Sequence, residues 1–514
     1  MIYFIGIDIG TTGAKAVLIN INGVVVTTAT NEYPMFTPHP FWAEQNPDDW
    51  WNAACKSIQN VLSQSKVNTR DVKGVGLTGQ MHGLVTLDKD GKVLYPCIMW
   101  NDQRTGEECL EITEKVGFNN LLSITGNQVL PGFTAPKIIW LRKNKPNVYS
   151  KINRVLLPKD YIRYKLTSEY FSDVSDASGT SLLNVKGRKW SQEILDKLEI
   201  PIEWLPEVVE SISQTGNITK YVSDLTGLTE GTPVFAGGGD QAAGGIGAGA
   251  VKEGIVSIVL GTSGVVFTHS ENYRIETEGK LHAFCHSVPN KWHLMGVTLS
   301  AAGSFRWYRD TFAQLEKYES EKAGKDVYDI LTSQAATVQA GSEGLFFLPY
   351  LTGERTPHPD PNARGAFIGL NIRHTKAHLT KSVLEGVAYS LRDCYELISN
   401  LGIKAERLIV SGGGAKSKLW RGVIADVFNA EINTLTCTEG APYGAAILAA
   451  VGSQNYKNVN EACEKILKIE SKIEPDKQRV SIYNDFYSIY KHLYPQLKNS
   501  FQNISEKVNQ HYGS

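Results

Sequence analysis

The sequence has no long uncharged apolar run. None of its apolar segments reaches the ~18 residues that a membrane-spanning helix needs. The first residues also lack the basic segment of a secretory signal peptide, and they reach a charged residue, Asp8, early. We therefore expect a cytoplasmic protein that has no membrane partner.

Paired cysteines and an excess of either charge are also missing. The seven cysteines are odd in number, are scattered and form no C-x-x-C. This pattern predicts reduced thiols rather than a disulfide framework or a zinc site. Lysine and arginine together number 52 and aspartate and glutamate 53, so the net charge is -1. We expect no nucleic-acid partner, and any phosphate would have to be bound by local backbone amides.

The common nucleotide-binding motifs are absent or incomplete. The sequence has no G-x-x-x-x-G-K-[ST], which excludes a P-loop protein. Residues 237–242, GGGDQA, fit the loose dinucleotide pattern G-x-G-x-x-G/A after an expected strand. That pattern also needs an acidic residue ~20 positions later, and Ser257–Ser263 contains none. The sequence therefore disfavours a nicotinamide cofactor.

Two carboxylates stand at the ends of expected strands, beside small residues. Asp240 follows the strand Pro233–Ala236 and three glycines, which we expect to end that strand. A segment of alanine and glycine comes next and predicts a helix that lies close to other backbone. Asp8 stands near the end of the first apolar strand. We interpret Asp8 and Asp240 as one site, with Asp240 as a general base and Asp8 as a Mg²⁺ ligand that acts through water.

Two Gly-Thr/Ser turns each follow a strand. Glycine lets backbone N–H groups point into one concavity, and the hydroxyls of Thr11, Thr12 and Thr262 add donors for phosphate oxygens. The alternative is two ordinary hairpin turns, but their matched places favour phosphate binding. Lys15 could reach a phosphate or could be a solvated strand residue. The turns are Gly10–Gly13 and Gly261–Gly264.

A third glycine-rich turn and two polar clusters complete the candidate site. Gly412–Gly414, followed by Ser417, would let a flat group such as a purine approach, or would form a tight strand–helix corner. His82 and Asp102 stand at strand ends, the latter two residues after Trp100, and can bind hydroxyl groups of a small polyhydroxylated molecule. For His82 the alternative is a structural histidine.

The order of expected elements occurs twice in the 514 residues, which are enough for two or more domains. A strand, a Gly/Thr turn and two more strands precede alternating strands and helices in each half. This repetition predicts an α/β protein with two duplicated domains and a cleft between them. The tail from about Ser481 is expected to be helical, with a kink or interruption at Pro495.

Nine stretches together resemble the FGGY family of carbohydrate kinases, which has the ribonuclease H-like fold of the actin-like ATPase superfamily. The resemblance covers nearly the whole chain and thins over its last ~40–60 residues, as end segments tend to vary. The matching stretches are DIGTTGAK at 8–15, GQMHG at 79–83, WNDQR at 100–104, TGNQVLPGFTAPK at 125–137, SDASGT at 175–180, GGGDQAAG at 237–244, GTSGVVF at 261–267, HAFCHSVPNKWHLMGVTLSAAG at 282–303 and SGGGAKS at 411–417.

The resemblance implies roles for individual residues. Asp240 matches the family's general base and Asp8 the carboxylate near the metal, while Met81 and His82 match the pair that contacts a ketose. Gln241 follows the base where related bacterial enzymes often have Asn, so its hydroxyl contacts with the sugar are expected to differ. The nucleotide side is matched by Gly261, Thr262, Gly413, Gly414 and Ser417.

The resemblance also implies an activity and a domain division. We expect ATP-dependent phosphorylation of D-xylulose with Mg²⁺, with ribulose or gluconate as alternative substrates. An actin- or chaperone-like ATPase that needs no sugar is the alternative from another class. The enzyme is expected to bind a small ketose and ATP and could form a homodimer. The expected domains are 1–248, which binds the sugar, 249–455, which binds the nucleotide, and a helical extension at 456–514.

Overall fold

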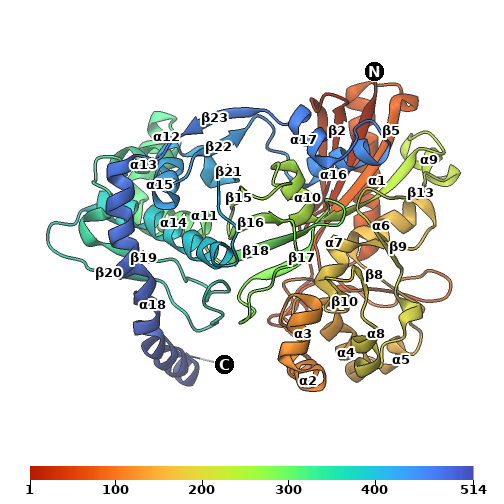
Figure 1. The fold of residues 1–514 in the computed structure, drawn as a ribbon, viewed down its shortest axis with the longest axis horizontal. Coiled ribbons are helices and arrows are strands. Elements are labelled where there is room, and N and C mark those ends of the chain that lie inside the picture. The colour runs from red at the N-terminus through yellow and green to blue at the C-terminus, as the bar shows by residue number, and fades with distance from the viewer. Residues whose placement is uncertain (513–514) are drawn as a thin grey trace. The chain divides into compact units, whose positions relative to one another are not determined.

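The computed structural model describes residues 1–512 (Figure 1). The chain divides into two compact units, each built from several segments. Unit 1 contains residues 1–252, 269–293 and 439–468, and unit 2 contains residues 253–268, 294–438 and 469–514. The expected domain limits at 248 and 455 stay a prediction.

A six-stranded sheet forms the centre of unit 1. Its strands follow the order β13-β14-β5-β1-β2-β3. β1 pairs antiparallel with β2 and parallel with β5, and β5 pairs parallel with β14. The expected end of a strand at Ala236 is wrong, because β14 continues through the three glycines. The bounds are β1 Tyr3–Ile9, β2 Gly13–Asn20, β3 Val25–Glu32, β5 Val72–Gly79, β13 Gln214–Asn217 and β14 Pro233–Gly239.

The second sheet repeats this arrangement. Six of its seven strands correspond to the strands of the first sheet and follow the order β18-β16-β15-β21-β22-β23, and the seventh, β17, lies beside β18 at the edge. β15 is antiparallel to β16 and parallel to β21, and β21 is parallel to β22. The same sequence of pairings in both sheets confirms the predicted duplication. The bounds are β15 Ile255–Leu260, β16 Gly264–Ser270, β18 Trp292–Thr298, β21 Arg407–Ser411, β22 Ile432–Leu435 and β23 Ile469–Ile473.

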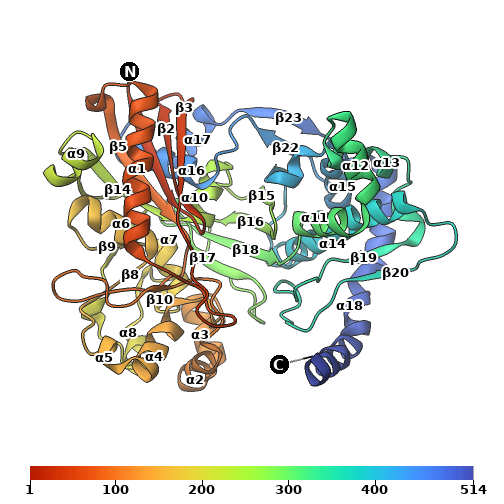
Figure 2. The same cartoon turned by 180° about the vertical axis from the view of Figure 1, so that it is seen from behind.

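Helices cover both faces of the sheet in unit 1, as Figure 1 and Figure 2 show from opposite sides. Helix α1, Pro47–Ser65, packs on β2 and β3 and begins at the cap residue Asn46, whose side chain accepts from the Asp48 N–H. Helix α16, Ala441–Gly452, packs on β1 and β5, and helix α10, Asp240–Gly247, packs on α16. These two small-residue helices confirm the expected close approach of backbones.

Further helices and short strand pairs complete unit 1. The helices are α2 Gly106–Val116, α3 Phe118–Thr125, α4 Thr134–Asn144, α5 Pro146–Tyr149, α6 Pro158–Thr167, α7 Val174–Ala177, α8 Gln192–Leu198, α9 Lys220–Thr226 and α17 Val459–Ile466. The paired short strands are β4 Glu44–Gln45 with β7 Cys97–Ile98, β6 Val85–Leu87 with β8 Arg154–Leu156, β9 Phe171–Asp173 with β12 Glu207–Val209, and β10 Leu183–Asn184 with β11 Lys189–Trp190. β17, His282–Cys285, also belongs to this unit.

The helices of unit 2 surround its sheet and include the two longest of the described chain. Helix α14 spans Lys376–Asn400 and α18 spans Lys477–Tyr512. The others are α11 Ala302–Phe312, α12 Gln314–Ala323, α13 Val327–Ala335 and α15 Lys418–Phe428. Two short strands, β19 Phe346–Leu348 and β20 Ala366–Ile368, pair antiparallel and are joined by residues 349–365.

Helix α18 begins near the expected residue but is not interrupted at Pro495. Contacts on both sides of the proline position the helix. On its C-terminal side, Arg364 Nη2 donates to Ser505 Oγ at 3.0 Å, and on its N-terminal side two tyrosines make the contacts. Tyr490 donates to the Gly386 carbonyl at 3.3 Å, and Tyr494 donates to Asp360 Oδ2 at 2.7 Å. Tertiary contacts of this kind hold a helix together across a residue that lacks the backbone N–H. The expected interruption is therefore wrong, and the alternative expectation, a kink at Pro495, stays a prediction.

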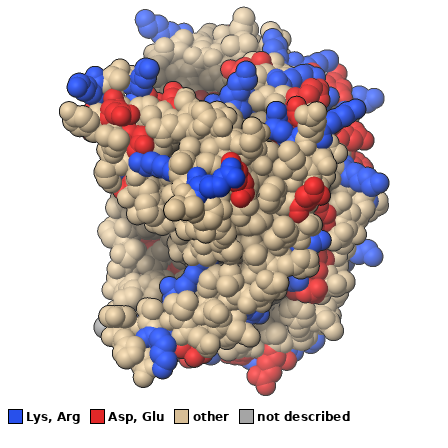
Figure 3. All heavy atoms as spheres, turned by 90° about the vertical axis from the view of Figure 1, so that its left-hand side faces the viewer, with Lys and Arg blue, Asp and Glu red and all other residues tan. Residues whose placement is uncertain are grey.

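The surface and the thiols agree with an ordinary globular chain. On the face seen in Figure 3, basic and acidic residues lie intermixed around a larger uncharged area. All seven cysteines lie within residues 1–512 and are thiols outside any disulfide, and six of them are buried, which confirms the expected thiols. Within residues 1–512, no helix combines the length and the apolar character that crossing a bilayer requires.

We expect Gly76→Ala to destabilise unit 1. A Cβ atom on Gly76 would lie 2.0 Å from the backbone oxygen of Ala445, so α16 would have to move away from β5. Overpacking of this kind costs about 1–3 kcal/mol, which a lower urea midpoint of the unfolding transition would report. The control is Gly106→Ala, because its Cβ would meet nothing within 4 Å. Equal midpoints for the two variants would contradict the close contact.

Candidate active site

The parallel pairing in unit 1 brings the two candidate carboxylates to one edge of the sheet. β5 lies between β1 and β14, and its residue Thr78 is paired with Asp8 on one side and with Gly238 on the other. Asp240 follows two residues later, at the first turn of α10. The predicted union of Asp8 and Asp240 therefore follows from strand order, since parallel strands end at the same edge.

Both carboxyl groups have raised pKa values. Burial, followed by the charge of Asp240, raises the pKa of Asp8 to about 7, while Lys15 lowers it. Burial also raises the pKa of Asp240 to about 6, against hydrogen bonds from the backbone and side chain of Gln241. Asp8 Oδ1 is buried and has no hydrogen-bond partner among the described residues. An unsatisfied carboxylate oxygen fits a cation or a proton donor of a ligand.

The turn that follows Asp8 is held by its own carbonyl groups. Tyr33 Oη donates to the Gly10 carbonyl at 2.5 Å, and Gln45 Nε2 donates to the Thr11 carbonyl at 2.7 Å. Trp100 Nε1 donates to Thr11 Oγ1 at 3.1 Å, which leaves that hydroxyl able to donate to a ligand. Phosphate contacts of Thr11 and Thr12 stay a prediction.

Lys15 lies in β2 and forms an ion pair with Glu439. Glu439 is the first residue of the last segment of unit 1 and stands two residues before α16. The structure thus gives a third possibility beside the two considered from the sequence, a phosphate contact and a solvated residue. A phosphate contact would have to compete with the Glu439 carboxylate, and it stays a prediction.

His82 is oriented by contacts on three sides. Its backbone has a φ of 72°, and its ring stacks on Phe133 with centroids 4.4 Å apart. Its Nδ1 lies 2.6 Å from the Gly179 carbonyl, which can only accept, so Nδ1 carries a proton. Lys137 Nζ donates to the His82 carbonyl at 2.9 Å, and burial lowers the pKa of Lys137 to about 7.

Met81 places this cluster beside the candidate base. Its side chain is buried, and a Cβ atom on Gly239 would lie 2.9 Å from Met81 Cγ. Gly239 immediately precedes Asp240, and Gln241 follows it in α10. The structure therefore brings four of the predicted substrate residues together: Met81, His82, Asp240 and Gln241.

Asp102 has a different setting, with all its side chain buried. Its Oδ2 accepts from the Ala43 N–H at 2.6 Å and from Arg104 Nη2 at 2.7 Å, and its Oδ1 accepts from Arg104 Nε at 2.9 Å. The Arg104 guanidinium lies 3.6 Å above the Trp42 ring. Both oxygens are thus engaged within the protein, and a sugar contact of Asp102 stays a prediction. Sequence reasoning missed Arg104, although the Asp-x-Arg spacing is visible.

The candidate nucleotide residues lie in unit 2. The Gly261 carbonyl accepts from the Ala302 N–H at 2.8 Å, and the Thr262 carbonyl accepts from the Ala301 N–H at 2.9 Å, so this turn is joined to the start of α11. In the other turn, a Cβ on Gly413 would meet nothing within 4 Å, whereas one on Gly414 would lie 2.9 Å from Trp420. Gly413 is open to a ligand and Gly414 forms a packed corner.

Ser417 has a structural partner of its own. It caps α15, since its Oγ accepts from the Trp420 N–H at 3.2 Å. The nucleotide contacts of Gly261, Thr262, Gly413, Gly414 and Ser417 stay predictions.

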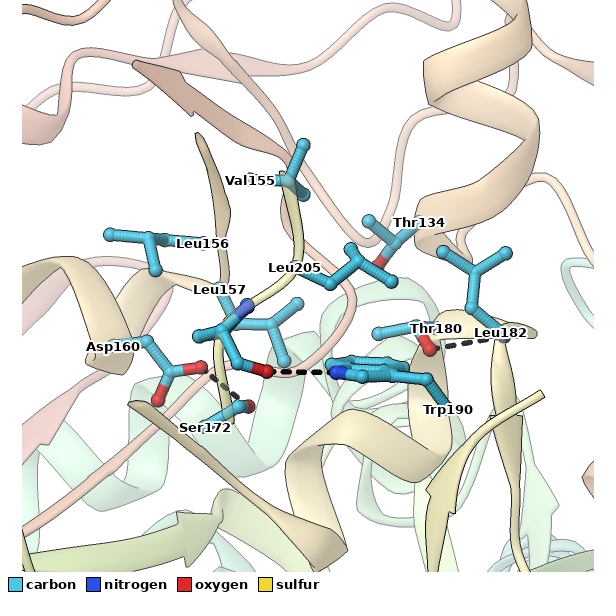
Figure 4. Close-up of a pocket in the computed structure, with 11 residues that line it drawn as sticks. Thr134, Val155, Leu156, Leu157, Asp160, Ser172, Thr180, Leu182, Trp190 and Leu205 are labelled. Atoms are coloured by element: carbon cyan, nitrogen blue, oxygen red, sulfur yellow. Dashed lines mark hydrogen bonds between the residues drawn. The ribbon is translucent and has the colours of Figure 1, made fainter. Parts of the chain in front are cut away.

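A small cavity lies behind the His82 cluster, and Figure 4 shows the side chains that line it. Polar groups of Thr134, Asp160, Ser172 and Thr180 face a mainly apolar wall. Its volume of about 10 Å³ leaves room for a single water molecule. The cavity is therefore too small to hold a sugar.

Comparison with known proteins covers almost the whole chain. Residues 3–247 match the FGGY family of carbohydrate kinases, N-terminal domain, and residues 256–453 match its C-terminal domain. A xylulose kinase from Bacillus subtilis is 38% identical over 97% of this chain and 98% of its own. A crystal structure of a xyloylose kinase from Brucella ovis is 37% identical, with a TM-score of 0.88, and the match covers 97% of this chain and 99% of that one. A Bacillus subtilis gluconokinase is 30% identical over 98% of both chains.

We expect the titrations of Asp8 and Asp240 to be coupled. Asp240→Asn removes a charge that raises the pKa of Asp8, so the titration midpoint of Asp8 should fall from its value of about 7. Lys15→Met removes a charge that lowers the same pKa and should shift the midpoint upward. ¹³C NMR of aspartate-labelled protein measures both, with Asp8 assigned by its loss in Asp8→Asn. An unchanged midpoint in both variants would show that the groups are not in one site.

Proposed function

We propose that this chain, which belongs to the FGGY family of carbohydrate kinases, phosphorylates D-xylulose with ATP to give D-xylulose 5-phosphate and ADP. The observation that carries the proposal is the position of Asp240 at the start of α10, next to the Met81–His82 cluster. Xylulose kinases at 38–39% identity over nearly the full chain support this substrate.

Asp240 serves as the general base in this proposal. Its pKa of about 6 keeps it largely ionised at neutral pH, yet leaves it more basic than an ordinary aspartate. The carboxylate takes the proton of the attacking sugar hydroxyl as the phosphorus–oxygen bond to the sugar forms. The bond between the γ-phosphorus and the β–γ bridging oxygen breaks, and ADP leaves with the electron pair.

Asp8 fits a Mg²⁺ ion that accompanies the nucleotide. A buried carboxylate oxygen without a partner is a suitable ligand, and Mg²⁺ usually keeps several water ligands beside one or two carboxylates. When bound, the ion would neutralise negative charge on the phosphates. We infer further phosphate contacts from Thr11, Thr12 and Lys15 in unit 1, and nucleotide contacts from Gly261, Thr262, Gly413, Gly414 and Ser417 in unit 2.

The charges around His82 favour a neutral ketose over a sugar acid. Gluconate would need a cation for its carboxylate, and the two cations beside this cluster are already engaged. Lys137 donates to the carbonyls of His82 and Gly132 at 2.9 and 2.7 Å, and Arg104 is paired with Asp102. Gluconate remains the second candidate because of the similarity to a gluconokinase.

The seven cysteines remain thiols, which supports a reducing compartment. We therefore propose that the reaction takes place in the cytoplasm. Measuring the distribution of the protein between cell fractions tests this location directly.

The test of the function is ADP release with Mg-ATP and xylulose, ribulose, gluconate, glycerol or no sugar. We expect the highest kcat/KM with xylulose and little release without sugar. If ADP is released at the same rate without sugar, the result favours an actin-like ATPase. A higher kcat/KM with gluconate favours the second candidate.

We expect Asp240→Asn to lose about 10²–10⁴-fold in kcat, the usual effect of removing a general base, while xylulose still binds in calorimetry. The matched control is Asp224→Asn, because Asp224 is exposed and is paired only with Lys220 on α9. A near-wild-type kcat for Asp240→Asn would place the base elsewhere.

A further inference from the structure

The segment Asp173–Thr180 has no role in the mechanism described so far. It contains the end of β9, helix α7 and a short 3₁₀ turn at Ser178–Thr180, and every residue in it is buried. Its sequence, DVSDASGT, places two carboxylates and three hydroxyl groups in the interior. Buried polar groups are destabilising unless they are hydrogen-bonded, so the partners of these groups indicate what the segment holds in place.

The C-terminal end of the segment holds His82. The Gly179 carbonyl accepts from His82 Nδ1 at 2.6 Å and thereby sets the tautomer of the ring. No side chain fits at this point, because a Cβ atom on Gly179 would lie 2.5 Å from the His82 ring and 3.0 Å from Met81 Cε. The segment therefore contacts both residues of the proposed ketose-binding pair.

The N-terminal end of the segment holds the strand that leads to Asp240. Ser175 Oγ accepts from the Gly239 N–H at 3.1 Å and donates to Asp173 Oδ2 at 2.6 Å. A third partner, Ser287 Oγ, lies at 3.2 Å. A hydroxyl group has one proton and two acceptor positions, so these contacts use all of its capacity. Ser175 thus fixes the backbone amide one residue before Asp240.

A buried ion pair fixes the partner of Ser175. Asp173 Oδ1 lies 2.9 Å from Lys159 Nζ, which also contacts Asp160 and Asp176. Burial would lower the pKa of Lys159, but the three carboxylates outweigh it and raise that pKa, so the ammonium stays charged. Ser211 Oγ also donates to Asp173 Oδ2, at 2.9 Å. Movement of Asp173 would leave buried charge unpaired, so the anchor of Ser175 is rigid.

The back of the segment is also filled. Thr180 and Ser172 border the small cavity of Figure 4, where Ser172 donates to Asp160. That cavity holds at most one water molecule, so the side of the segment at Thr180 is closely packed.

We propose that Ser175 is a positioning residue for phosphoryl transfer, and that the segment from Ser175 to Gly179 fixes the distance between the base and the ketose-binding histidine. The inference rests on the proposed function, because it assigns Asp240 and His82 the roles given there. Ser175, which contacts the Gly239 amide, and Gly179, which contacts His82, are only four positions apart in the chain. A hydroxyl bound at His82 and the carboxylate of Asp240 therefore share one rigid support. Small displacements of reacting groups strongly reduce the rate.

The test compares Ser175→Ala with Ser211→Ala. Both remove a hydroxyl that donates to Asp173 Oδ2, but only Ser175 contacts the Gly239 amide. We expect kcat to fall about 10–100-fold for Ser175→Ala, with KM for ATP within twofold of wild type. Ser211→Ala should stay within twofold in both constants. Equal kcat values for the two variants, or an equal loss in both, would overturn the inference.

Two further measurements keep the test decisive. If Ser175→Ala does not fold, as judged by its thermal midpoint, Ser287→Ala removes the third partner of the same hydroxyl and should lower kcat by a smaller factor; no loss would count against the inference. All variants are measured on the best sugar of the wild-type protein. Failure with xylulose in the wild type therefore rejects the substrate, whereas wild-type kcat in Ser175→Ala on that best sugar rejects the positioning role.

Discussion

The site in unit 1 depends on the parallel pairing of β1, β5 and β14. This pairing brings Asp8 and Asp240 from distant parts of the sequence to one edge of a sheet. It also brings two negative groups into a poorly hydrated place, which is unfavourable unless a proton or a cation accompanies them. The raised pKa values of both groups express that cost. A kinase can use this unfavourable charge to bind its substrates, because the nucleotide brings a cation and the sugar hydroxyl brings a proton.

Local patterns predicted the elements well where tertiary contacts agree with them. The first strands and α1 follow from apolar runs, turn residues and the Asn46–Pro47 start. The three glycines before Asp240 predicted the end of a strand, yet β14 continues because Gly238 and Gly239 pair with β5. Pro495 predicted a kink or an interruption, yet the helix continues without a break, supported by contacts of Tyr494 before the proline and of Ser505 after it. Both errors arise from long-range contacts that local sequence does not encode.

The candidate site divides in the same way. Asp8, Asp240 and the Met81–His82 pair stand in short distinctive motifs, so they could be identified from the sequence. The partners that fix their geometry could not. Asp102 shows this, since its pairing with Arg104 depends on the Trp42 ring from another loop. Ser175 shows it as well, because its contact with Gly239 joins residues 64 positions apart.

Helix α16 has a consequence for the order in which the protein forms during synthesis. Residues 441–452 pack against β1 and β5, both of which are made more than 360 residues earlier. The first sheet therefore leaves the ribosome with one apolar face uncovered and can complete its core only when nearly the whole chain has emerged. Most domains fold as they are made, from the N-terminus onward. Here the carboxylate-bearing unit can complete its core only after its last segment, residues 439–468, has been made, and unit 2 only after the segment that begins at residue 469.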